Sequence, residues 1–188
     1  KISIVKDSRY IHLDINARKN LELTSSSSTN QKKGSLLWLL DRTKTAMGGR
    51  MIRSFIEQPL TDEIVINERL DGVEELSGDL ILRENLIDSM KGFSDIERKC
   101  GKISAGTITP KECIALADTI SKLPEIKRLL LSCKSKILHE AGERITLLTD
   151  IEKVLKDAIS VDAPANLKDG GYILSSYNEE LEKLRNAG

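Results

Sequence analysis

Aromatic side chains are scarce in this chain of 188 residues, where they make up 3% of the sequence. So few rings leave little for unpaired bases to stack on, which argues against an aromatic platform for single-stranded nucleic acid. Apolar residues of all kinds still reach 39%, and a chain of this length can bury one continuous core. We therefore expect one domain, or one domain with a short addition, packed mainly through aliphatic side chains.

Cysteines and long apolar runs are also in short supply. The three cysteines, Cys100, Cys113 and Cys133, form no close pair, so their spacing suggests neither a disulfide framework nor a zinc site. Cys100 and Cys113 lie on apolar helical stripes, where a thiol usually acts as a small hydrophobic group. No run has the length of a membrane span or a signal-peptide core, and the chain opens on Lys1 instead of Met. These features predict a cytoplasmic protein without membrane contact, and the sequence reads as part of a longer one.

Recognisable catalytic patterns are missing as well. Nothing matches the Gly-x-x-x-x-Gly-Lys-Ser/Thr loop that wraps nucleotide phosphates. The two histidines, His12 and His139, lie far apart in the sequence and have no motif around them. Adjacent carboxylates such as Glu74 and Glu75 point in different directions on a helix, so we interpret them as parts of solvated faces. The residues therefore predict no catalytic site, cofactor site or metal site in this chain.

Charge is balanced overall but not along the chain. The 29 Lys and Arg residues equal the 29 Asp and Glu residues, so the chain as a whole is not a polyanion-binding module. Residues 1–60 nevertheless hold 11 basic and 5 acidic side chains, a balance of +6, which leaves −6 for the rest. Four of these basic residues are candidate phosphate contacts: Arg42, Lys44, Arg50 and Arg53. Charge patterning alone favours the alternative, in which they lie on solvated helix faces or form salt bridges with the acidic remainder.

The N-terminal part of the chain begins with the period of a strand. Apolar and polar residues alternate over residues 2–13, as in a half-buried strand. Asp14 can then cap a brief helix that runs through Leu21. The polar segment 25–35 has too few apolar residues to offset the entropy of ordering, so we expect an exposed loop there.

Helix signals dominate from Ser35 onward. Four of the Ser/Thr-x-x-Glu segments, whose first and last side chains can cap backbone amides, are predicted capping boxes, at residues 94–97, 109–112, 149–152 and 176–179. Apolar residues spaced by three and four accompany each of them, and Pro110 stands where its missing N–H costs nothing. Each of the four segments predicts the start of a helix.

Further helices are expected before these, over residues 36–40, 47–55 and 64–76. Gly48 and Gly49 predict a tight bend between helices. About seven helices joined by short turns predict a mainly α protein, an irregular multi-helix bundle with a minor β element at its N-terminal end.

Two long segments carry a more specific pattern. LDINARKNLEL is followed by a polar loop and then by GSLLWLLDRTKTAMGGRMIRSFIEQPL, and together they resemble the start of the core domain in the MutS family of mismatch-repair proteins. The matching positions are Leu13, Asp14, Asn20, Leu21, Glu22, Gly34, Ser35, Leu36, Leu40, Asp41, Thr43, Thr45, Met47, Gly48, Arg50, Pro59 and Leu60. SDIERKCGKIS resembles the family's Asp-x-Glu-Arg segment at Asp95, Glu97 and Arg98, and LKDGGYILSSYNEELEKLR resembles its approach to the clamp. The form of these segments is closest to the bacterial, mismatch-recognising branch.

The resemblance implies a mechanical role. In such proteins a homodimer grips mismatched double-stranded DNA, an N-terminal domain senses the mismatch, and a distant C-terminal domain uses ATP and magnesium. The helical core joins these parts and continues as lever helices into a clamp on the DNA. The parent protein would be a DNA-dependent ATPase that works with partners such as MutL. We expect no catalysis from this chain, which has no P-loop.

The resemblance also implies an organisation. It divides the chain into residues 1–24, strands and a short helix that lead into the core; 25–35, the polar loop; 36–165, the helical core domain; and 166–188, the start of the lever helix before the clamp. Trp38, among leucines, is expected to be a packing anchor or an interdomain contact. The leading hypothesis is a segment that couples the ATPase to mismatched-DNA binding and the clamp. The alternative is a helical module that binds the DNA backbone non-specifically through its basic front, with steep salt dependence.

Overall fold

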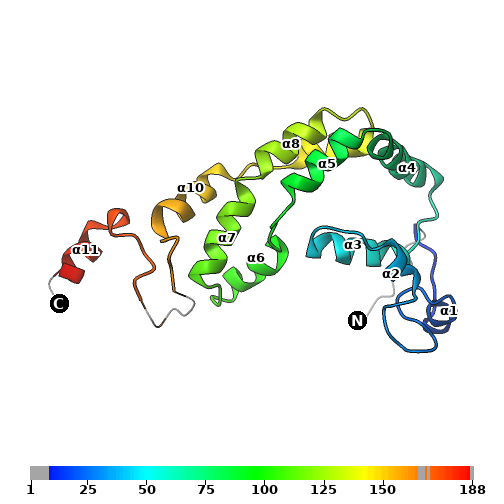
Figure 1. Ribbon diagram of the computed structural model, residues 1–188, viewed down its shortest axis with the longest axis horizontal. Coiled ribbons are helices and arrows are strands. Elements are labelled where there is room, and N and C mark those ends of the chain that lie inside the picture. Colours follow the sequence, from blue (N-terminus) through cyan, green and yellow to red (C-terminus); the bar gives the residue numbers. More distant parts are fainter. Residues whose placement is uncertain (1–8, 165–167, 169, 187–188) are drawn as a thin grey trace, which may run out of the picture.

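The computed structural model describes residues 9–164, 168 and 170–186 of the chain. Its helices are α1 (Ile15–Asn20), α2 (Leu36–Leu40), α3 (Ala46–Glu57), α4 (Glu63–Gly78), α5 (Leu80–Ser89), α6 (Ile96–Ser104), α7 (Pro110–Ile120), α8 (Leu123–Leu131), α9 (Lys136–Arg144), α10 (Thr149–Ala158), the 3-10 turn η2 (Ser175–Tyr177) and α11 (Glu179–Asn186). Figure 1 shows them along an elongated molecule, with α1 near one end and α11 at the other. The described part is mainly α, as predicted. None of its helices is long and apolar enough to cross a bilayer.

The predicted β element is wrong for the described residues, which contain no β-strand. The part of this prediction that falls before Arg9 lies outside them. Tyr10 forms only an isolated antiparallel bridge with Leu60. Asp14 accepts a hydrogen bond from the Ala17 amide at 2.6 Å and so starts α1. The extended segment is therefore too short to pair over several residues.

Residues 9–61 form a unit with its own core, here named the N-terminal unit. The buried apolar side chains of that core are Leu23, Leu37 and Ile56, with Leu13 and Ile52 packed against them. Helix α2 packs on α3. The Leu37 amide donates to the Leu23 carbonyl at 2.9 Å, which ties the start of α2 back to the end of α1.

The polar segment 25–35 is mostly exposed but closes on itself. Ser26 and Ser35 are buried, with 8% and 2% of their surface exposed. The Glu22 carboxylate accepts a hydrogen bond from the Ser27 amide at 2.5 Å. That bond lowers the pKa of Glu22. Local hydrogen bonds from polar side chains thus order this segment in place of apolar burial.

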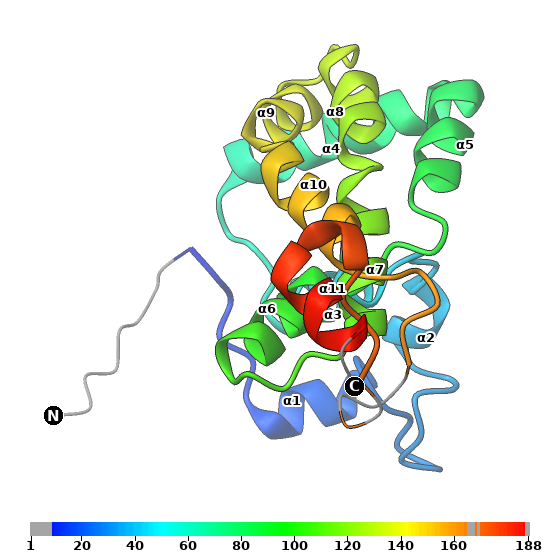
Figure 2. The same cartoon turned by 90° about the vertical axis from the view of Figure 1, so that its left-hand side faces the viewer.

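Residues 62–164 form a second body, here named the central unit. In it α7 packs on α6 and α10, α8 on α5 and α9, and α4 on α5 and α9. Its core cluster is Leu116, Ile120 and Leu123, surrounded by Phe93, Ile96, Ile145, Leu147, Leu148 and Leu155. Figure 2 shows α4, α5, α8 and α9 together at the top of the view, with α1 at the bottom. The described residues therefore have two core clusters instead of one continuous core, because α2, α3 and the residues that flank α1 pack their apolar side chains against one another.

Several helix boundaries differ from the prediction. The helical spacing of apolar residues that follows the predicted cap at 109–112 continues from Cys113 to Leu123, but α7 ends at Ile120 and α8 starts at Leu123, with Pro124 in its first turn. The sequence did not predict α5 or α9. Gly48 and its neighbour lie inside the first turn of α3, so the predicted bend between helices is wrong. Thr45 caps that helix by accepting from the Gly48 amide at 3.0 Å.

One of the four predicted capping boxes is confirmed. The Thr109 hydroxyl accepts from the Glu112 amide at 3.3 Å, and the Glu112 carboxylate accepts from the Thr109 amide at 3.0 Å. At residues 94–97 the cap of α6 is Asp95, one residue later than predicted. Ser94 is unavailable as a cap because its hydroxyl forms a hydrogen bond with the Thr119 hydroxyl at 2.6 Å.

The two later boxes do not form. Thr149 lies inside α10, after Leu148, whose left-handed φ of 52° breaks the chain direction, and no side chain caps the helix. At the start of α11 the Asn178 side chain accepts from the amides of Glu180 and Leu181, at 2.9 and 3.1 Å. Asn178 therefore takes the place predicted for Ser176, which lies in the preceding 3-10 turn.

The cysteines and the tryptophan differ in how far they are buried. Cys100 is exposed, so the prediction that it packs as an apolar residue is wrong. Helix α6 turns Lys99 inward instead, with 8% of its surface exposed. Cys133 is the buried cysteine, and Cys113 is half-buried. Trp38 leaves 44% of its surface exposed in α2.

Candidate functional site

The N-terminal unit and the central unit meet where α3 lies beside α6 (Figure 1). The Arg50 guanidinium donates to both oxygens of Asp95, at 2.6 and 2.9 Å. The same guanidinium donates to the Glu97 carboxylate at 2.5 Å. Two parallel N–H···O bonds from one arginine to one carboxylate fix both orientation and distance. We name these three residues the Arg50 cluster.

Charge is concentrated in the Arg50 cluster and partly sheltered from water. The side chains of Arg50 and Asp95 are 37% and 15% exposed, whereas that of Glu97 is 74% exposed. Hydrogen bonding from Arg50 lowers the pKa of Asp95 to about 2. The carboxylates in turn raise the pKa of Arg50, with Asp95 the larger contributor. Arg50 and Asp95 are therefore both charged at neutral pH.

Hydrogen bonds within α6 and to α7 fix the position of Asp95. It accepts from the Arg98 amide at 3.2 Å and so caps α6. Its neighbour Ser94 shares a 2.6 Å hydrogen bond with the hydroxyl of Thr119 in α7. Thr119 is fully buried and donates to the Ala115 carbonyl at 2.7 Å. A buried polar network of this kind allows one arrangement of its members, so the carboxylate that meets Arg50 is held firmly.

Two lysines join α6 to α7 further along. The buried Lys99 ammonium donates to the Glu112 carbonyl at 2.8 Å, and its burial lowers the pKa of Lys99. Lys102 forms an ion pair with the Glu112 carboxylate. This pair, with the capping hydrogen bonds of Thr109, lowers the pKa of Glu112 to about 2. Helices α6 and α7 thus present Asp95 and Glu97 on a stiff platform.

A second contact between the two units also depends on an arginine. The Arg69 guanidinium, from α4, lies over the ring of Phe55 in α3, 3.8 Å from its centroid. A guanidinium over an aromatic face is attracted by the ring quadrupole. Among the described residues, none of the closely packed helix pairs joins the N-terminal unit to the central unit. The interface between the units is thus held by cationic side chains, outside both core clusters.

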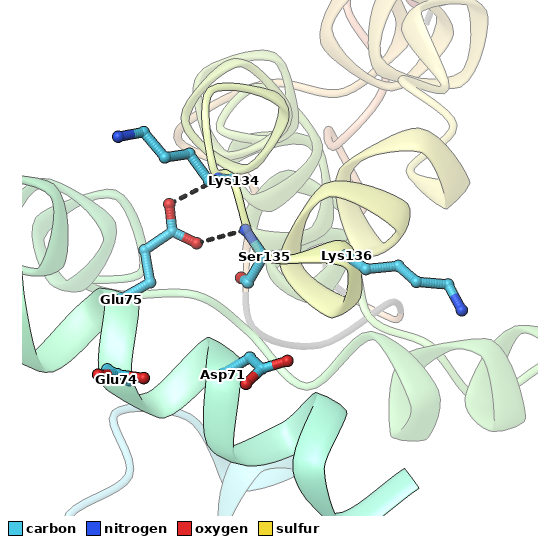
Figure 3. A pocket seen from close by; sticks show the side chains of 6 residues that line it. All are labelled: Asp71, Glu74, Glu75, Lys134, Ser135 and Lys136. Atoms are coloured by element: carbon cyan, nitrogen blue, oxygen red, sulfur yellow. Dashed lines mark hydrogen bonds between the residues drawn. The ribbon is translucent and has the colours of Figure 1, made fainter. Parts of the chain in front are cut away.

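An open depression of about 450 Å³ lies elsewhere, between α4 and the start of α9. Figure 3 shows the Glu75 carboxylate directed at the chain before α9, where it accepts from the amides of Lys134 and Ser135 at 2.6 and 2.7 Å. These bonds lower the pKa of Glu75. The interpretation of Glu75 as part of a solvated face is therefore wrong, since it supplies acceptors for amides that a helix start leaves free. The depression marks a structural tie between α4 and α9.

The four candidate phosphate contacts fall in different surroundings. Arg50 is engaged by Asp95 and Glu97, and Arg53 pairs with Glu57 one turn along α3 at 3.0 Å. Arg42 and Lys44 are exposed on the segment between α2 and α3, and neither forms an ion pair within the described part of the chain. Phosphate contact by these residues stays a prediction.

The sequence did not single out, from composition or spacing, the residues that form or support the contact with Arg50. Asp95 and Glu97 were marked only by the family resemblance. Lys99 and Thr119 were missed, although a threonine next to Ile120 in an apolar stripe is a signal for a buried hydroxyl that needs partners.

Comparisons with known proteins agree with this architecture. The family described as MutS domain III matches residues 16–187 of the chain. The DNA mismatch repair protein MutS of Clostridioides difficile (strain 630) is 45% identical over 184 residues, which cover 98% of this chain and 19% of that protein. Its namesake in Alkaliphilus oremlandii is 45% identical over 184 residues, with 98% and 21% covered. That of Lachnoclostridium phytofermentans is 42% identical over 180 residues, with 96% and 19% covered.

The chain thus spans about a fifth of the length of the curated relatives it matches. The resemblance seen in its motifs is confirmed over nearly the whole sequence. The chain belongs to the MutS domain III family, as a segment of a bacterial DNA mismatch-repair protein.

Proposed function

We propose that this chain couples distant sites of a mismatch-repair protein and catalyses nothing itself. In the longer protein, a separate domain would bind ATP with magnesium and act as a DNA-dependent ATPase. The substrate would be mismatched double-stranded DNA, gripped by two copies of the protein in the cytoplasm, and MutL would be among its partner proteins. This chain would transmit movement between the ATPase domain and the DNA-binding parts, including the clamp.

One observation carries this proposal: the two units have separate cores and meet through the Arg50 cluster. Coupling between distant sites needs an element with more than one arrangement, biased by both sites. Two separately packed bodies can change their relative angle while each core stays intact. Helices can transmit such a change of angle over a distance, because a helix is stiff and extends by about 1.5 Å per residue.

We also propose the division of the chain that the family resemblance implies. Residues 1–24 lead into the core, 25–35 form the polar loop, 36–165 are the helical core domain, and 166–188 begin the lever. The position of α11 at the far end of the molecule from α1 supports a lever that extends away from the N-terminal unit (Figure 1).

Weak contact with DNA phosphates is proposed for the basic residues around the start of α3. Arg42 and Lys44 are the best placed of the four, because both are exposed. Arg50 and Arg53 would first have to leave their carboxylate partners. Such contacts would add affinity without sequence preference.

The test is fluorescence anisotropy of labelled homoduplex and single-mismatch DNA with this chain, at low and at near-physiological salt. We expect weak binding that is equal for the two duplexes and is abolished by salt. The double variant Arg42→Ala with Lys44→Ala should reduce the low-salt binding further. The double variant Lys111→Ala with Lys153→Ala removes the same charge from exposed positions of the central unit and serves as the control. Tight binding that survives salt, or that prefers the mismatch, would replace coupling with recognition as the role of this segment.

A further inference from the structure

The way in which the two units are joined differs from the way in which each is packed. Each unit has its own apolar cluster. Across the junction lie the Arg50 cluster and the stacked pair of Arg69 and Phe55. The covalent connection is short and extended, since α3 ends at Glu57 and α4 begins at Glu63.

The extended connection is hydrogen-bonded to the N-terminal unit. The Ile11 amide donates to the Pro59 carbonyl at 2.8 Å, and the Thr61 amide donates to the Arg9 carbonyl at 2.9 Å. These bonds fasten residues 59–61 to the N-terminal segment. Asp62 already caps α4, which belongs to the central unit. The pivot between the two bodies therefore lies at the junction of Thr61 and Asp62.

We propose that the Arg50 cluster is an ionic latch that holds the N-terminal unit at one angle to the central unit, and that the two units turn about the Thr61–Asp62 junction when it opens. The latch joins residues 45 and 47 positions apart in the sequence, so it closes only when the bodies are correctly oriented. Its bidentate geometry makes the closed angle specific.

An ionic latch is suited to opening. The arm to Glu97 is exposed, and exposed ion pairs contribute little net free energy because solvation of the separated charges nearly offsets their attraction. Salt weakens such pairs further, since the Debye length falls from about 10 Å at 0.1 M to about 3 Å at 1 M. An apolar seam would lack this sensitivity. The latch can thus open under conditions that leave both core clusters packed.

The latch also decides whether Arg50 is available. While it is closed, the guanidinium donates to three carboxylate oxygens of Asp95 and Glu97. An anion that binds Arg50 must compete with them, and so favours the open arrangement. This inference deepens the proposed coupling role and rests on it for its biological meaning. Its test uses the chain alone, so either proposal can fail without the other.

The chain offers a natural pair of probes for this angle. Trp38 is its single tryptophan and lies in α2 of the N-terminal unit. Cys100 is the exposed cysteine and lies in α6 of the central unit. Burial raises the pKa of the Cys113 and Cys133 thiols, which makes them less reactive. An aminonaphthalene acceptor can therefore be attached to Cys100, with mass spectrometry and a Cys100→Ser control to verify its position.

The experiment measures energy transfer from Trp38 to the labelled Cys100 as salt is raised. We expect the efficiency to fall in the unsubstituted chain while the far-ultraviolet circular dichroism stays constant. Arg50→Ala should show the low efficiency already at low salt and lose most of the salt response. Arg53→Ala removes the same charge from the same helix, but its partner Glu57 lies within α3, so it should behave like the unsubstituted chain.

Two further variants should weaken the latch without removing it. Arg50→Lys keeps the charge without the bidentate geometry and should fall between the two extremes. Glu97→Gln removes one exposed arm of the latch and should shift the salt response to lower concentration, with the helix content intact even if Arg50→Ala proves unstable. Energy transfer that is unchanged in Arg50→Ala and in Glu97→Gln, or that responds equally in Arg53→Ala, would overturn the latch.

Discussion

The N-terminal unit and the central unit are stabilised in different ways. The N-terminal unit has a small cluster around Leu37 and relies on exposed carboxylates to order its loops. The central unit surrounds Ile120, which is 1% exposed, with apolar side chains from several helices. Apolar burial resists salt and pH, whereas exposed hydrogen-bonded carboxylates do not. One chain can thus combine a stiff body with a second body whose attachment responds to salt and pH.

The largest effect should come from emptying the central core. Ile120→Ala removes a buried side chain and should cost about 2–5 kcal/mol of unfolding free energy, through lost burial and the cavity left behind. Ile56→Ala is the matched change in the N-terminal unit. Urea unfolding should be followed by circular dichroism, for total helix, and by Trp38 fluorescence, for the N-terminal unit. We expect Ile120→Ala to lower mainly the first midpoint and Ile56→Ala mainly the second. If both probes shift together in both variants, the two units unfold as one.

A smaller effect should follow from crowding a helix crossing. A Cβ at Gly142 of α9 would lie 3.0 Å from the Leu130 Cβ and 3.1 Å from the Leu131 amide nitrogen. Gly142→Ala should therefore cost about 1–3 kcal/mol, because backbone of α8 must move.

Gly101 provides the opposite control for this change. It lies in α6 with open space where its Cβ would be. Gly101→Ala should stabilise the protein by about 0.5–1 kcal/mol, through higher helix propensity and a less flexible unfolded chain. Thermal melts of both variants measure these changes, and changes of the same sign would contradict the packing seen between α8 and α9.

The confirmed capping box should contribute less. Thr109→Ala removes the hydroxyl that caps α7 and should cost about 1 kcal/mol. Thr149→Ala is the control, because Thr149 stands in a similar sequence but lies inside α10 without a capping role. The denaturant midpoints of the two variants measure these losses of stability. Equal losses would mean that the sequence motif, and not the observed hydrogen bond, sets the effect.

Acidification should produce the smallest effect per group and should act on both units. Hydrogen bonding from Lys32 lowers the pKa of Asp41 from 3.8 to about 2, and that from Lys102 lowers the pKa of Glu112 from 4.5 to about 2. Because each folded-state pKa lies below its unfolded value, the stabilisation is complete above about pH 5 and is lost as pH falls toward 2.

Matched variants assign this acid sensitivity to each unit. Asp41→Asn should flatten the pH dependence of the Trp38 transition, and Glu112→Gln should flatten that of total helix. Melting temperatures measured from pH 7 to pH 2 test this. A pH profile that neither substitution alters would show that other carboxylates dominate.

Predictions from sequence succeeded where the interacting residues lie close together. Asp14 caps α1 through Ala17, and Thr109 caps α7 through Glu112, each within three residues. Such bonds form whenever the local backbone turns into a helix. The burial of Ser26 and Ser35 in the polar segment 25–35 was not predicted.

Predictions failed where a distant partner competed for the same group. Ser94 has the right spacing to cap α6, but Thr119 of α7 takes its hydrogen bonds. Glu75 looks like one of two solvated carboxylates, but it binds amides 59 and 60 positions away. Lys99 was overlooked because nothing local distinguishes a buried lysine from an exposed one. Its acceptor is the Glu112 carbonyl, which α7 brings into reach.

By itself the sequence determined the helical character, the start of α1 and α7, and membership of the MutS domain III family. These follow from helical periodicity, from bonds within a single turn and from motifs spread over nearly the whole chain, which is 45% identical to a relative over 184 residues. Only the tertiary structure decided that the core is split in two and that Arg50 pairs with Asp95 and Glu97. A bond across 45 positions has no local signal, because its energy depends on how two separately packed bodies come to lie against each other.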